Sequence, residues 1–486
     1  MYYPDVEQVK KLKVKGNLVP VYREIIADME TPVSAFLKVK GAGFAFLLES
    51  VEGGQRMARY SVIGVDPYET LSVNTHDDVD TFKAVAERMR QYRVVVVEGL
   101  PRFSGGAVGY FAYETINRIE DLPSPEADRL ELPEAVFMFV DTLLVFDHVM
   151  HKIKVISHVK LDGDIEKSYR EAVAKIDRLI MRLETPLAGR KNLGGSLENY
   201  ETSPITSNFT AEAFGTAIDK IKQYITEGEA IQVVLSQRLC QPTAAEPFNV
   251  YRALRSINPS PYMFFLDFND YQIVGTSPEI LVRVEDGLVM TRPLAGTRPR
   301  GSDSAEDTAL ERELVADEKE RAEHVMLVDL GRNDIGRVAE PGSVVVSELM
   351  NVERYSHVMH MVTNVQGKLE EGLTAFDAMR ACFPAGTVSG APKIRAMEII
   401  AELEPEKRGP YAGAVGYFSF TGNMDMAIAI RTMILKGGKA YVQAGCGVVH
   451  DSVSEKEYEE TMNKARALLK AIGQAEGREA PRAAAY

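Results

Sequence analysis

Residues Glu318–Asp334, EKERAEHVMLVDLGRND, form the stretch around which the rest of the sequence is interpreted. Its spacing predicts a helix that runs from charged residues into an apolar segment. Glu320 and Glu323 are three residues apart, so their carboxylates lie on one face of such a helix. A second pair at this spacing, Glu457 and Glu460, opens the last expected helix. Each pair is either a solvent-exposed helix face or part of a cation site, and oxygen ligands without cysteine favour Mg²⁺ over Zn²⁺.

Composition limits the classes of partner. A chain of 486 residues is expected to form two domains or one large one. The net charge of −14 argues against binding to nucleic acid or to anionic membrane surfaces. The three cysteines are far apart and match neither a disulfide framework nor a metal motif, which is typical of a reducing compartment. The sequence has no signal-like N-terminus and no apolar run long enough to span a bilayer, so we expect a cytoplasmic protein.

The order of segments predicts an α+β fold with large, mostly antiparallel sheets, because strands outnumber helices and do not alternate regularly with them. We expect a first unit over residues 1–190, a polar connector over 191–209, a second unit over 210–473 and a frayed tail over 474–486. The sequence GAVGYF occurs once in each unit. Both copies resemble central strands in which glycine permits close approach of neighbouring backbones.

The first unit is expected to contain five strands and two helices. The strands are predicted at Phe44–Leu48, Arg59–Gly64, Gly105–Tyr113, Ala135–Phe146 and Lys152–His158. The first two are expected to pair, and the last is expected to form a hairpin with the strand before it. Helical spacing covers Phe82–Tyr92 and Ile165–Leu183.

The second unit is expected to begin with a helix and a short strand, followed by two hairpins. These are Phe214–Thr226, Ile231–Gln237, Tyr262–Val274 and Leu281–Thr291. Arg292–Gly301, RPLAGTRPRG, is predicted as a loop in which Gly296 and Thr297 offer N–H and hydroxyl donors to an anion. Thr387 within PAGTVSGAPK repeats this chemistry, and a tight turn is the alternative for both segments. Neither segment matches a Walker A loop, and no GxGxxG motif opens a βαβ unit, which argues against a nucleotide site.

Seven motifs of the second unit resemble, in order, those of the chorismate-utilising enzymes. They are SPE at Ser277–Glu279, PLAGT at Pro293–Thr297, KERAEH at Lys319–His324, GTVSGAPK at Gly386–Lys393, AIRT at Ala429–Thr432, QAGCG at Gln443–Gly447 and EYEETMNKA at Glu457–Ala465. Within that family the sequence is most similar to the anthranilate synthase component I group, and the likeness extends to LLES at Leu47–Ser50. The resemblance implies two antiparallel sheets packed as a sandwich with helices outside. It also implies a lyase of tryptophan biosynthesis that converts chorismate and ammonia to anthranilate and pyruvate.

The resemblance implies a Mg²⁺ ion that joins the ring carboxylate of chorismate to glutamates. That role falls on Glu323 and Glu460, with Glu320 and Glu457 beside or behind them. Ser454 and Glu457 also match a capping box, S-x-x-E, so Glu457 has a structural alternative.

The second carboxylate of chorismate, on its enolpyruvyl arm, is expected to bind four residues by the same resemblance: Tyr411, Arg431, Gly445 and Gly447. Arginine suits this role because its planar fork grips a carboxylate with two hydrogen bonds. Lys464 is expected to reach toward the substrate, and a surface ion pair with Glu460 is its alternative.

The catalytic set implied by the resemblance is Glu279, His360, Gln232 and Thr387. Glu279 matches the general acid that protonates the departing C4 hydroxyl, and His360 matches a histidine near the ring. A zinc site at His357 and His360 is disfavoured, because no further ligands flank them. Family members that add water have a lysine where this chain has Gln232. Those that make 4-amino-4-deoxychorismate have a nucleophilic lysine at the position of Ala295, so both residues favour anthranilate.

Two segments more than 200 residues apart, LLES and NPSPYM, resemble the tryptophan-binding elements of these enzymes. The implied inhibitor contacts are Leu48, Glu49, Ser50, Pro261, Tyr262 and Met263. For them to form one pocket, the two segments must pack against each other. An ordinary strand end and a proline-punctuated turn are the alternatives.

The source of ammonia is expected to be a separate chain. Cys382 and Cys446 do not lie in the glycine-rich elbow that a glutaminase nucleophile commonly needs. We therefore expect a glutamine amidotransferase partner in a heterodimer or heterotetramer. The alternatives are 4-amino-4-deoxychorismate synthase component I and a non-catalytic tryptophan sensor with the same fold.

Overall fold

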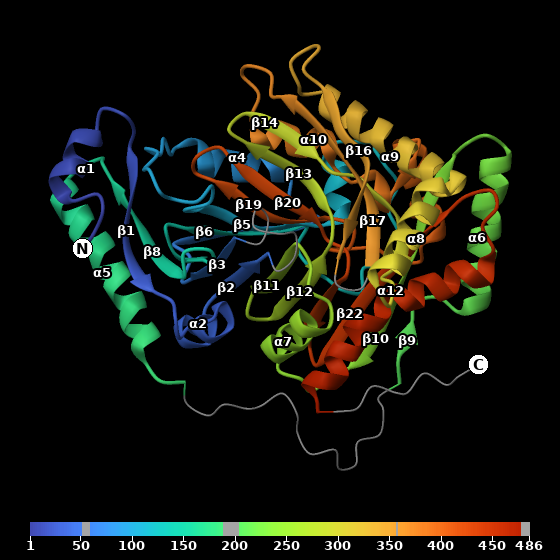
Figure 1. Ribbon diagram of the computed structural model, residues 1–486, viewed down its shortest axis with the longest axis horizontal. Coiled ribbons are helices and arrows are strands. Elements are labelled where there is room, and N and C mark those ends of the chain that lie inside the picture. The colour runs from blue at the N-terminus through green and yellow to red at the C-terminus, as the bar shows by residue number, and fades with distance from the viewer. Residues whose placement is uncertain (51–58, 188–203, 356–357, 478–486) are drawn as a thin grey trace.

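Two antiparallel sheets packed face to face form the centre of the molecule, and helices cover their outer faces (Figure 1). This computed structural model describes residues 1–50, 59–187, 204–355 and 358–477. One sheet has 12 strands and the other has 10. The predicted α+β sandwich is therefore confirmed.

The 12-stranded sheet has the order β1-β8-β7-β3-β2-β11-β12-β21-β22-β10-β18, and β9 also pairs with β10. Its strands are β1 (Leu18–Ile26), β2 (Ala45–Glu49), β3 (Tyr60–Val65), β7 (Thr142–Asp147), β8 (Lys152–Lys160), β9 (Thr206–Ser207), β10 (Gln232–Pro242), β11 (Tyr262–Asp267), β12 (Tyr271–Ser277), β18 (Gly390–Ala391), β21 (Thr432–Lys436) and β22 (Lys439–Val448).

The 10-stranded sheet has the order β15-β17-β14-β13-β20-β19-β5-β6-β4, and β16 also pairs with β17. Its strands are β4 (Glu69–Val73), β5 (Gly106–Phe111), β6 (Ala135–Val140), β13 (Ile280–Glu285), β14 (Leu288–Thr291), β15 (Leu294–Pro299), β16 (Val345–Arg354), β17 (Val358–Lys368), β19 (Ala414–Ser419) and β20 (Met424–Ile428).

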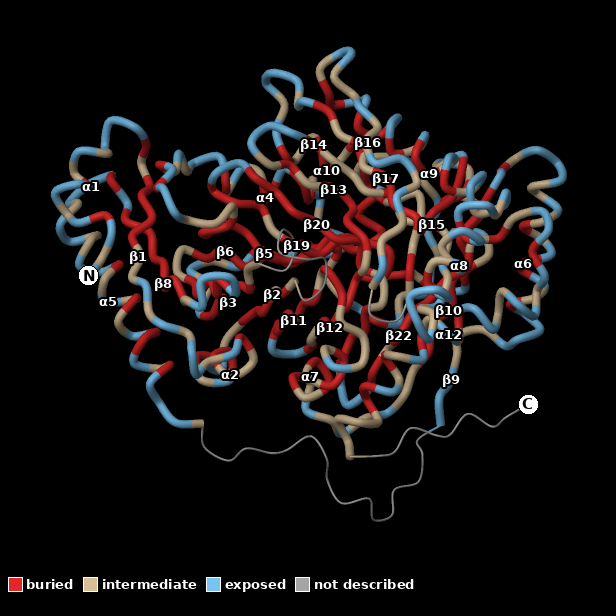
Figure 2. The backbone as a smooth tube through the Cα atoms, viewed as in Figure 1, coloured by how far each residue is buried: buried red, intermediate tan, exposed pale blue. Residues whose placement is uncertain are grey.

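Helices lie on both outer faces. They are α1 (Val6–Leu12), α2 (Pro32–Val39), α4 (Thr81–Arg90), α5 (Ile165–Glu184), α6 (Ala211–Thr226), α7 (Pro247–Ile257), α8 (Ser304–Ala316), α9 (Glu318–Gly336), α10 (Ala375–Cys382), α11 (Lys393–Leu403) and α12 (Ser454–Ala475), with 3₁₀ turns η1 (Tyr113–Arg118) and η2 (Gly386–Val388). Most buried backbone lies in the two sheets, whereas helix surfaces and loop tips are exposed (Figure 2).

Three large apolar layers hold the sandwich together. The layer between the sheets includes Phe46 and Phe264 from one sheet and Val108 and Met138 from the other. A second layer fills the space between the 12-stranded sheet and helices such as α5, α7 and α12. A third lies between the 10-stranded sheet and helices such as α4, α9 and α10. Burial of apolar surface on both faces explains why so many strands read as continuous hydrophobic runs.

Both sheets combine strands from the two predicted units. In one sheet β2 pairs with β11, and in the other β5 pairs with β19. The two GAVGYF copies are direct neighbours, with Gly109 opposite Gly416. A Cβ on Gly109 would stand 1.9 Å from the Val136 carbonyl oxygen, so glycine is required there. The predicted boundary between the two units, at the connector, remains a prediction. Residues 188–203 lie outside the described part of the chain, and both sheets contain strands from either side of this boundary.

Several local predictions are confirmed and three are corrected. The two hairpins of the second unit form as β11–β12 and β13–β14. The segment predicted as one strand over 135–146 is two strands, because the chain passes at Asp141 from β6 in one sheet to β7 in the other. Both strands are buried on both faces, so the hydrophobic pattern shows no break.

The segment predicted as a loop over 292–301 is largely strand β15, which pairs with β17 and shifts register at Gly296. Proline and glycine suggested a loop, but they occupy a strand at the sheet edge and its irregular step. Helix α8, which no prediction covered, lies between β15 and α9.

Helix α12 lacks the predicted capping box. It begins at Ser454, and Val453 is its N-cap residue without a side-chain bond. The Ser454 hydroxyl donates instead to Asp219, 3.1 Å away, and the Glu457 N–H donates to the Val453 carbonyl. The match to S-x-x-E was wrong because Ser454 already lies inside the helix.

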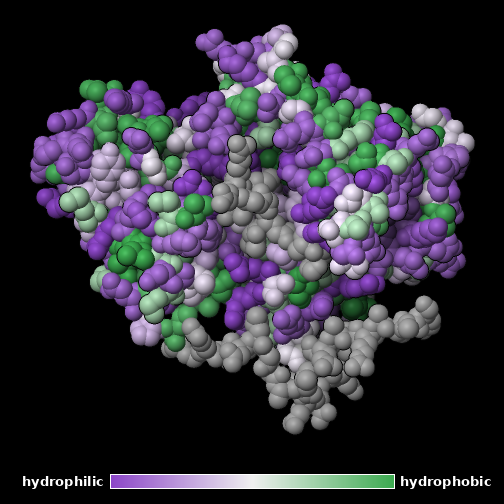
Figure 3. Space-filling model, viewed as in Figure 1, coloured by the Kyte–Doolittle hydropathy of each residue, from purple (hydrophilic) through white to green (hydrophobic). Residues whose placement is uncertain are grey.

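On the face shown in Figure 3 hydrophilic residues predominate, and hydrophobic ones are scattered among them. Within the described residues, no helix combines the length and apolar character needed to cross a membrane.

Candidate active site

One cavity of about 620 Å³ is lined by every residue predicted to act in catalysis, substrate binding or metal binding. The fifteen residues are Gln232, Glu279, Gly296, Thr297, Glu320, Glu323, His360, Thr387, Tyr411, Arg431, Gly445, Gly447, Glu457, Glu460 and Lys464. They come from strands of both sheets, from α9, α12 and η2, and from loops between them. The structure therefore brings together motifs that span more than 230 residues of sequence.

Strands β10 and β22 form one wall, in which glycine leaves space for other side chains. Val234 lies opposite Gly447 and Ser236 opposite Gly445. A Cβ on Gly447 would stand 2.4 Å from Gln232 Nε2, and one on Gly445 would stand 2.9 Å from the Tyr411 hydroxyl oxygen. The QAGCG motif thus admits two predicted site residues, and its backbone borders the cavity.

Glu279 lines the cavity from the short connection between β12 and β13. Its residue is only 6% exposed, and burial raises the pKa of its carboxyl to about 8. The nearby Thr387 side chain and the backbone N–H of Leu294 oppose this shift without overcoming it. Glu279 is therefore protonated at neutral pH and has a proton to donate.

His360, on β17, faces the cavity as a neutral ring. Its Nδ1 is 3.0 Å from the Gly296 carbonyl oxygen, to which it donates, and 3.0 Å from Thr297 Oγ1. Burial lowers the pKa of the imidazole, which favours the neutral form. The bond to a carbonyl fixes the proton on Nδ1 and leaves Nε2 as an acceptor. His357 lies outside the described residues, so the histidine pair considered in the sequence has no described geometry.

Arg431 presents a cation to the cavity. Within the described part of the chain, its guanidinium makes no hydrogen bond and no ion pair with a side chain, although burial lowers its pKa. A half-buried cation without an anionic partner is costly, so the geometry suits an anionic ligand. The residue has a φ of 49°, in the left-handed region that non-glycine residues seldom adopt.

The four glutamates line the same cavity from two helices, Glu320 and Glu323 from α9 and Glu457 and Glu460 from α12. Burial raises the pKa of Glu320 and Glu457, and the negative charges of Glu323 and Glu460 respectively add to this. Their oxygen donors and excess negative charge fit a divalent cation chemically.

The glutamates nevertheless have other partners in this conformation. Glu320 pairs with Arg298 at 3.3 Å, Glu323 accepts from Gln232 Nε2 at 3.0 Å, and Glu460 pairs with Lys464 at 2.7 Å. Over the residues described, no three histidine, cysteine or acidic side chains already converge in a metal-binding arrangement. Lys464 also donates to the Gly445 carbonyl at 2.9 Å, so the predicted i,i+4 pair and a position at the cavity wall occur together.

Three polar residues that line the cavity were not predicted: Lys319, Gln443 and Asn463. Each lies within a motif already quoted, in KERAEH, QAGCG and EYEETMNKA. Helical spacing gave a usable signal for Asn463, which is three residues after Glu460 on α12.

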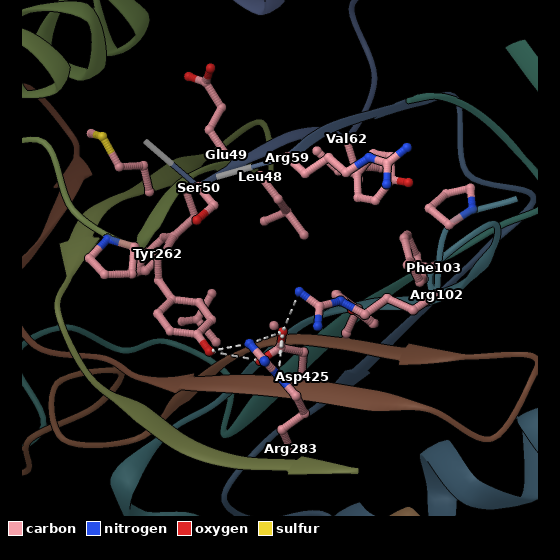
Figure 4. A pocket seen from close by; sticks show the side chains of 18 of the residues that line it. Leu48, Glu49, Ser50, Arg59, Val62, Arg102, Phe103, Tyr262, Arg283 and Asp425 are labelled. Carbon is pink, nitrogen blue, oxygen red and sulfur yellow. Dashed lines mark hydrogen bonds and ion pairs between the residues drawn. The ribbon is translucent and has the colours of Figure 1, made fainter. Parts of the chain in front are cut away.

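A second cavity, of about 430 Å³, is lined by all six predicted inhibitor contacts (Figure 4). Strand β2 pairs with β11 so that Glu49 lies opposite Met263, which places LLES beside the PYM segment as expected. Leu48 and Ser50 point into the cavity, and Tyr262 forms part of its wall (Figure 4). The packing of the two segments is confirmed, and the ligand stays a prediction.

Two of the six side chains turn away from this cavity. The Glu49 carboxylate points away from the cavity (Figure 4). It accepts from the Tyr251 hydroxyl at 2.5 Å and from Arg255 at 2.9 Å, and both partners belong to α7. Met263 is 1% exposed and packs into the apolar layer beneath the helices. Alternate residues of a strand face opposite sides of the sheet, so a run of adjacent residues cannot supply consecutive side-chain contacts.

The sequence did not predict the charged residues that line the polar side of this cavity. Tyr262 donates from its hydroxyl to Asp425 at 3.0 Å and accepts from Arg283 at 2.9 Å. Asp425 also pairs with Arg283, and Arg102 lies 3.8 Å from it. Arg283 and Asp425 are opposite each other on paired strands β13 and β20, a relation that no short motif encodes.

Comparison with known proteins agrees with this arrangement. Residues 43–470 match the family model described as chorismate binding enzyme. The chain belongs to this family. It is 52% identical to anthranilate synthase component 1 from Acetivibrio thermocellus, with 98% of this chain and 99% of that protein covered. It is 48% identical to anthranilate synthase component 1 from Pseudomonas aeruginosa, with 97% and 99% covered.

Solved structures place this chorismate binding enzyme in the same fold. Anthranilate synthase component I from Streptococcus pneumoniae TIGR4 superposes with a TM-score of 0.76 at 40% identity, covering 91% of this chain and 98% of that one. The menaquinone-specific isochorismate synthase from Escherichia coli superposes with a TM-score of 0.71 at 19% identity, covering 96% and 98%, and so shares the fold alone.

The two positions expected to separate members of the chorismate binding enzymes both line the cavity. Gln232 holds Glu323 through Nε2, while its buried Oε1 has no hydrogen-bond partner among the described residues. Ala295 is 7% exposed and carries no nucleophile. The cavity therefore has neither a lysine base at the first position nor a lysine nucleophile at the second.

Proposed function

We propose that the protein is the chorismate-binding component of an anthranilate synthase and converts chorismate and ammonia to anthranilate, pyruvate and water. The observation that carries the proposal is one cavity that combines a protonated acid, Glu279, with a cation, Arg431, that has no ion-pair partner among the described residues. The names of the similar proteins support the same reading.

Substrate orientation follows from the charges. Chorismate is a dicarboxylate, and Arg431 would hold its enolpyruvyl carboxylate with Tyr411 and the backbone of the Gly445–Gly447 segment. The ring carboxylate would then face the four glutamates, which repel it unless a cation lies between them. Mg²⁺ held by Glu323 and Glu460, with Glu320 and Glu457 next to them, would supply that positive charge.

The chemical step requires a proton at the C4 oxygen, because hydroxide is a poor leaving group. Ammonia forms a bond to C2, the ring double bonds shift, and the C4–O bond breaks as Glu279 donates its proton to give water. Loss of the C2 proton and of the C3–O bond then releases pyruvate and leaves an aromatic ring. Gln232 cannot deprotonate water, and Ala295 cannot form a covalent adduct, so neither competing reaction is favoured.

Tryptophan is the proposed ligand of the second cavity. Leu48, Ser50 and Tyr262 supply apolar, hydroxyl and aromatic surface for an indole amino acid. The cavity lies where strands from the two predicted units meet, so a ligand there can bias their packing.

A separate glutamine amidotransferase is the proposed source of ammonia. Cys382 and Cys446 are both buried in the structure, and burial raises the pKa of both thiols, which disfavours a nucleophilic thiolate.

The deciding experiment combines chorismate, Mg²⁺ and ammonium at alkaline pH and follows anthranilate fluorescence, with chromatography of the products. We expect anthranilate and an equal amount of pyruvate. Isochorismate, 4-amino-4-deoxychorismate or no product would each contradict the proposal.

The metal is tested separately. EDTA should abolish turnover and Mg²⁺ should restore it, whereas Glu323→Gln and Glu460→Gln should each lose nearly all turnover while retaining the wild-type melting temperature. Calorimetry should detect Mg²⁺ binding to the wild type and weaker binding to both variants. Unchanged binding in both would show that these glutamates are only a solvated face.

A further inference from the structure

A third cavity, of about 110 Å³, lies between the other two. It shares Pro261 with the proposed tryptophan cavity and shares His360 and Arg431 with the catalytic cavity. Its lining includes Thr276, on β12, which is fully buried and belongs to neither of the larger cavities.

Thr276 makes two hydrogen bonds that point toward opposite cavities. Its hydroxyl donates to the Asn258 carbonyl at 2.5 Å, and its backbone N–H donates to the Arg431 carbonyl at 3.1 Å. Asn258 begins the NPSP segment that reaches the tryptophan cavity at Pro261. Thr276 also lies opposite Met263 in the β11–β12 ladder. Thr276 is thus hydrogen-bonded both to the segment that reaches the tryptophan cavity and to a residue that lines the catalytic cavity.

The hydrogen bond from Thr276 to Arg431 matters because neighbouring residues must stabilise the backbone conformation of Arg431. Left-handed backbone is unfavourable for a non-glycine residue because its Cβ crowds the neighbouring carbonyl oxygen. The guanidinium has no side-chain partner among the described residues that would fix its direction, so its main chain must do so. The regular β12–β21 ladder ends at Gly275 and Thr432, and the Thr276 bond is the next contact beyond it.

The NPSP segment is stiff enough to transmit a displacement. Pro259 and Pro261 each have a fixed φ, so movement at Pro261 is poorly absorbed before Asn258. Asn258 is itself tied to α7, because its N–H donates to the Leu254 carbonyl at 2.9 Å. Movement of Asn258 therefore reaches Thr276 through a short bond and Arg431 through the next one.

We infer that Thr276 is a positioning residue that sets the orientation of Arg431 and couples the second cavity to chorismate binding. This inference rests on the proposed function. Its consequence is that occupation of the tryptophan cavity weakens chorismate binding through the backbone of Arg431, without contact between the ligands. Because coupling is reciprocal, chorismate must weaken tryptophan binding by the same factor.

The test is Thr276→Val, which removes the hydroxyl and keeps the shape of the side chain. We expect the KM for chorismate to rise up to about tenfold, as one hydrogen bond allows, with kcat within about twofold. Calorimetry in ammonium-free buffer should find tryptophan affinity unchanged without chorismate. The factor by which chorismate weakens tryptophan binding should fall toward one. Thr276→Ser retains the hydroxyl and should restore both properties.

Thr115→Val is the matched control. Thr115 is also fully buried and donates its hydroxyl to a backbone carbonyl, that of Glu134 at 3.2 Å, outside all three cavities. Thr115→Val should lower the stability of the protein without changing the KM for chorismate or the coupling between chorismate and tryptophan binding. If Thr276→Val does not fold, Thr276→Ala removes the same hydroxyl without a β-branch.

The outcomes are distinguishable. If the wild type makes no anthranilate or does not bind tryptophan, the proposed function is wrong. If the wild type does both and Thr276→Val keeps the wild-type KM and coupling, the positioning role is wrong. Failure of both hydroxyl-free variants to fold while Thr115→Val folds would make the bond a stability element and overturn the inference.

Discussion

At the scale of single residues, burial gives Glu279 its chemistry. A carboxyl that titrates near its ordinary range would be ionised at neutral pH and have no proton to donate. Burial raises the pKa of Glu279 to about 8, so kcat should fall about tenfold for each pH unit above that value. The Glu279→Gln variant should have a kcat about 10²- to 10⁴-fold lower than that of the wild type. Its pH profile should lack the alkaline limb, which is the fall in kcat above the pKa of Glu279. Stopped-flow fluorescence over pH 6–10 tests both expectations, and an unchanged alkaline limb in the variant would remove Glu279 as the acid.

The same pKa shift predicts a stability effect of defined sign. Because the folded state holds the proton more tightly than the unfolded chain, the protonated carboxyl favours folding at low pH. This contribution is fully present below the unfolded pKa of about 4.3 and is lost as pH rises through about 8. Glu279→Gln does not ionise, so its Tm relative to wild type should increase between pH 5 and pH 9. Calorimetric melts at both pH values measure this, and a relative Tm independent of pH would contradict it.

Arg431 is expected to act mainly in binding. Its removal would leave a buried substrate carboxylate unpaired, at a cost of about 2–5 kcal/mol. The contact persists through the reaction, so Arg431→Ala should raise the KM for chorismate far more than it lowers kcat. Arg431→Lys should recover only part of the affinity, because a single ammonium does not reproduce the bidentate fork. Steady-state kinetics of both variants decide the point, and an unchanged KM would exclude Arg431 from the site.

At the scale of elements, strand alternation decides which residues of a motif meet a ligand. Ser50 faces the second cavity, whereas Glu49 points away from it (Figure 4). The Glu49 carboxylate is bound by Tyr251 and Arg255 of α7. Ser50→Phe should fill the cavity, abolish inhibition by tryptophan and leave kcat within a few-fold of wild type. Glu49→Gln, at the adjacent residue, is the matched control. It should lower stability, because it weakens a buried ion pair, and it should leave inhibition intact. Full inhibition of Ser50→Phe by tryptophan would contradict this assignment.

Pairing between strands also limited what could be predicted from the sequence. The spacing of glutamates predicted helix faces correctly on α9 and α12, because helical periodicity is local. Strand β15 was predicted as a loop, because its proline and glycine are tolerated only through the irregular pairing with β17. That pairing places Gly296 beside His360, a relation between residues 64 positions apart.

At the scale of the whole molecule, both sheets are built from strands of the two halves of the chain. Strand β2 lies between β3 and β11, and β5 lies between β19 and β6. A fragment of residues 210–473 would lose these neighbours and expose the apolar layer between the sheets. We expect the fragment alone to aggregate or melt without cooperativity, and co-expression with residues 1–190 to restore a soluble complex. Size-exclusion chromatography and thermal melts test this, and a soluble, cooperatively melting fragment would support independent domains.

The sequence by itself determined the fold class, the family resemblance and fifteen of the residues that line the larger cavity. These depend on local periodicity and on motifs whose residues keep their order and spacing. Tertiary structure alone decided which side chains of those motifs face a cavity and which titrate abnormally. It turned Glu49 and Met263 away from the second cavity, buried Glu279, and brought Arg283 and Asp425 together from different strands. The physical reason is that orientation and burial arise from pairing and packing between distant segments, which no local pattern specifies.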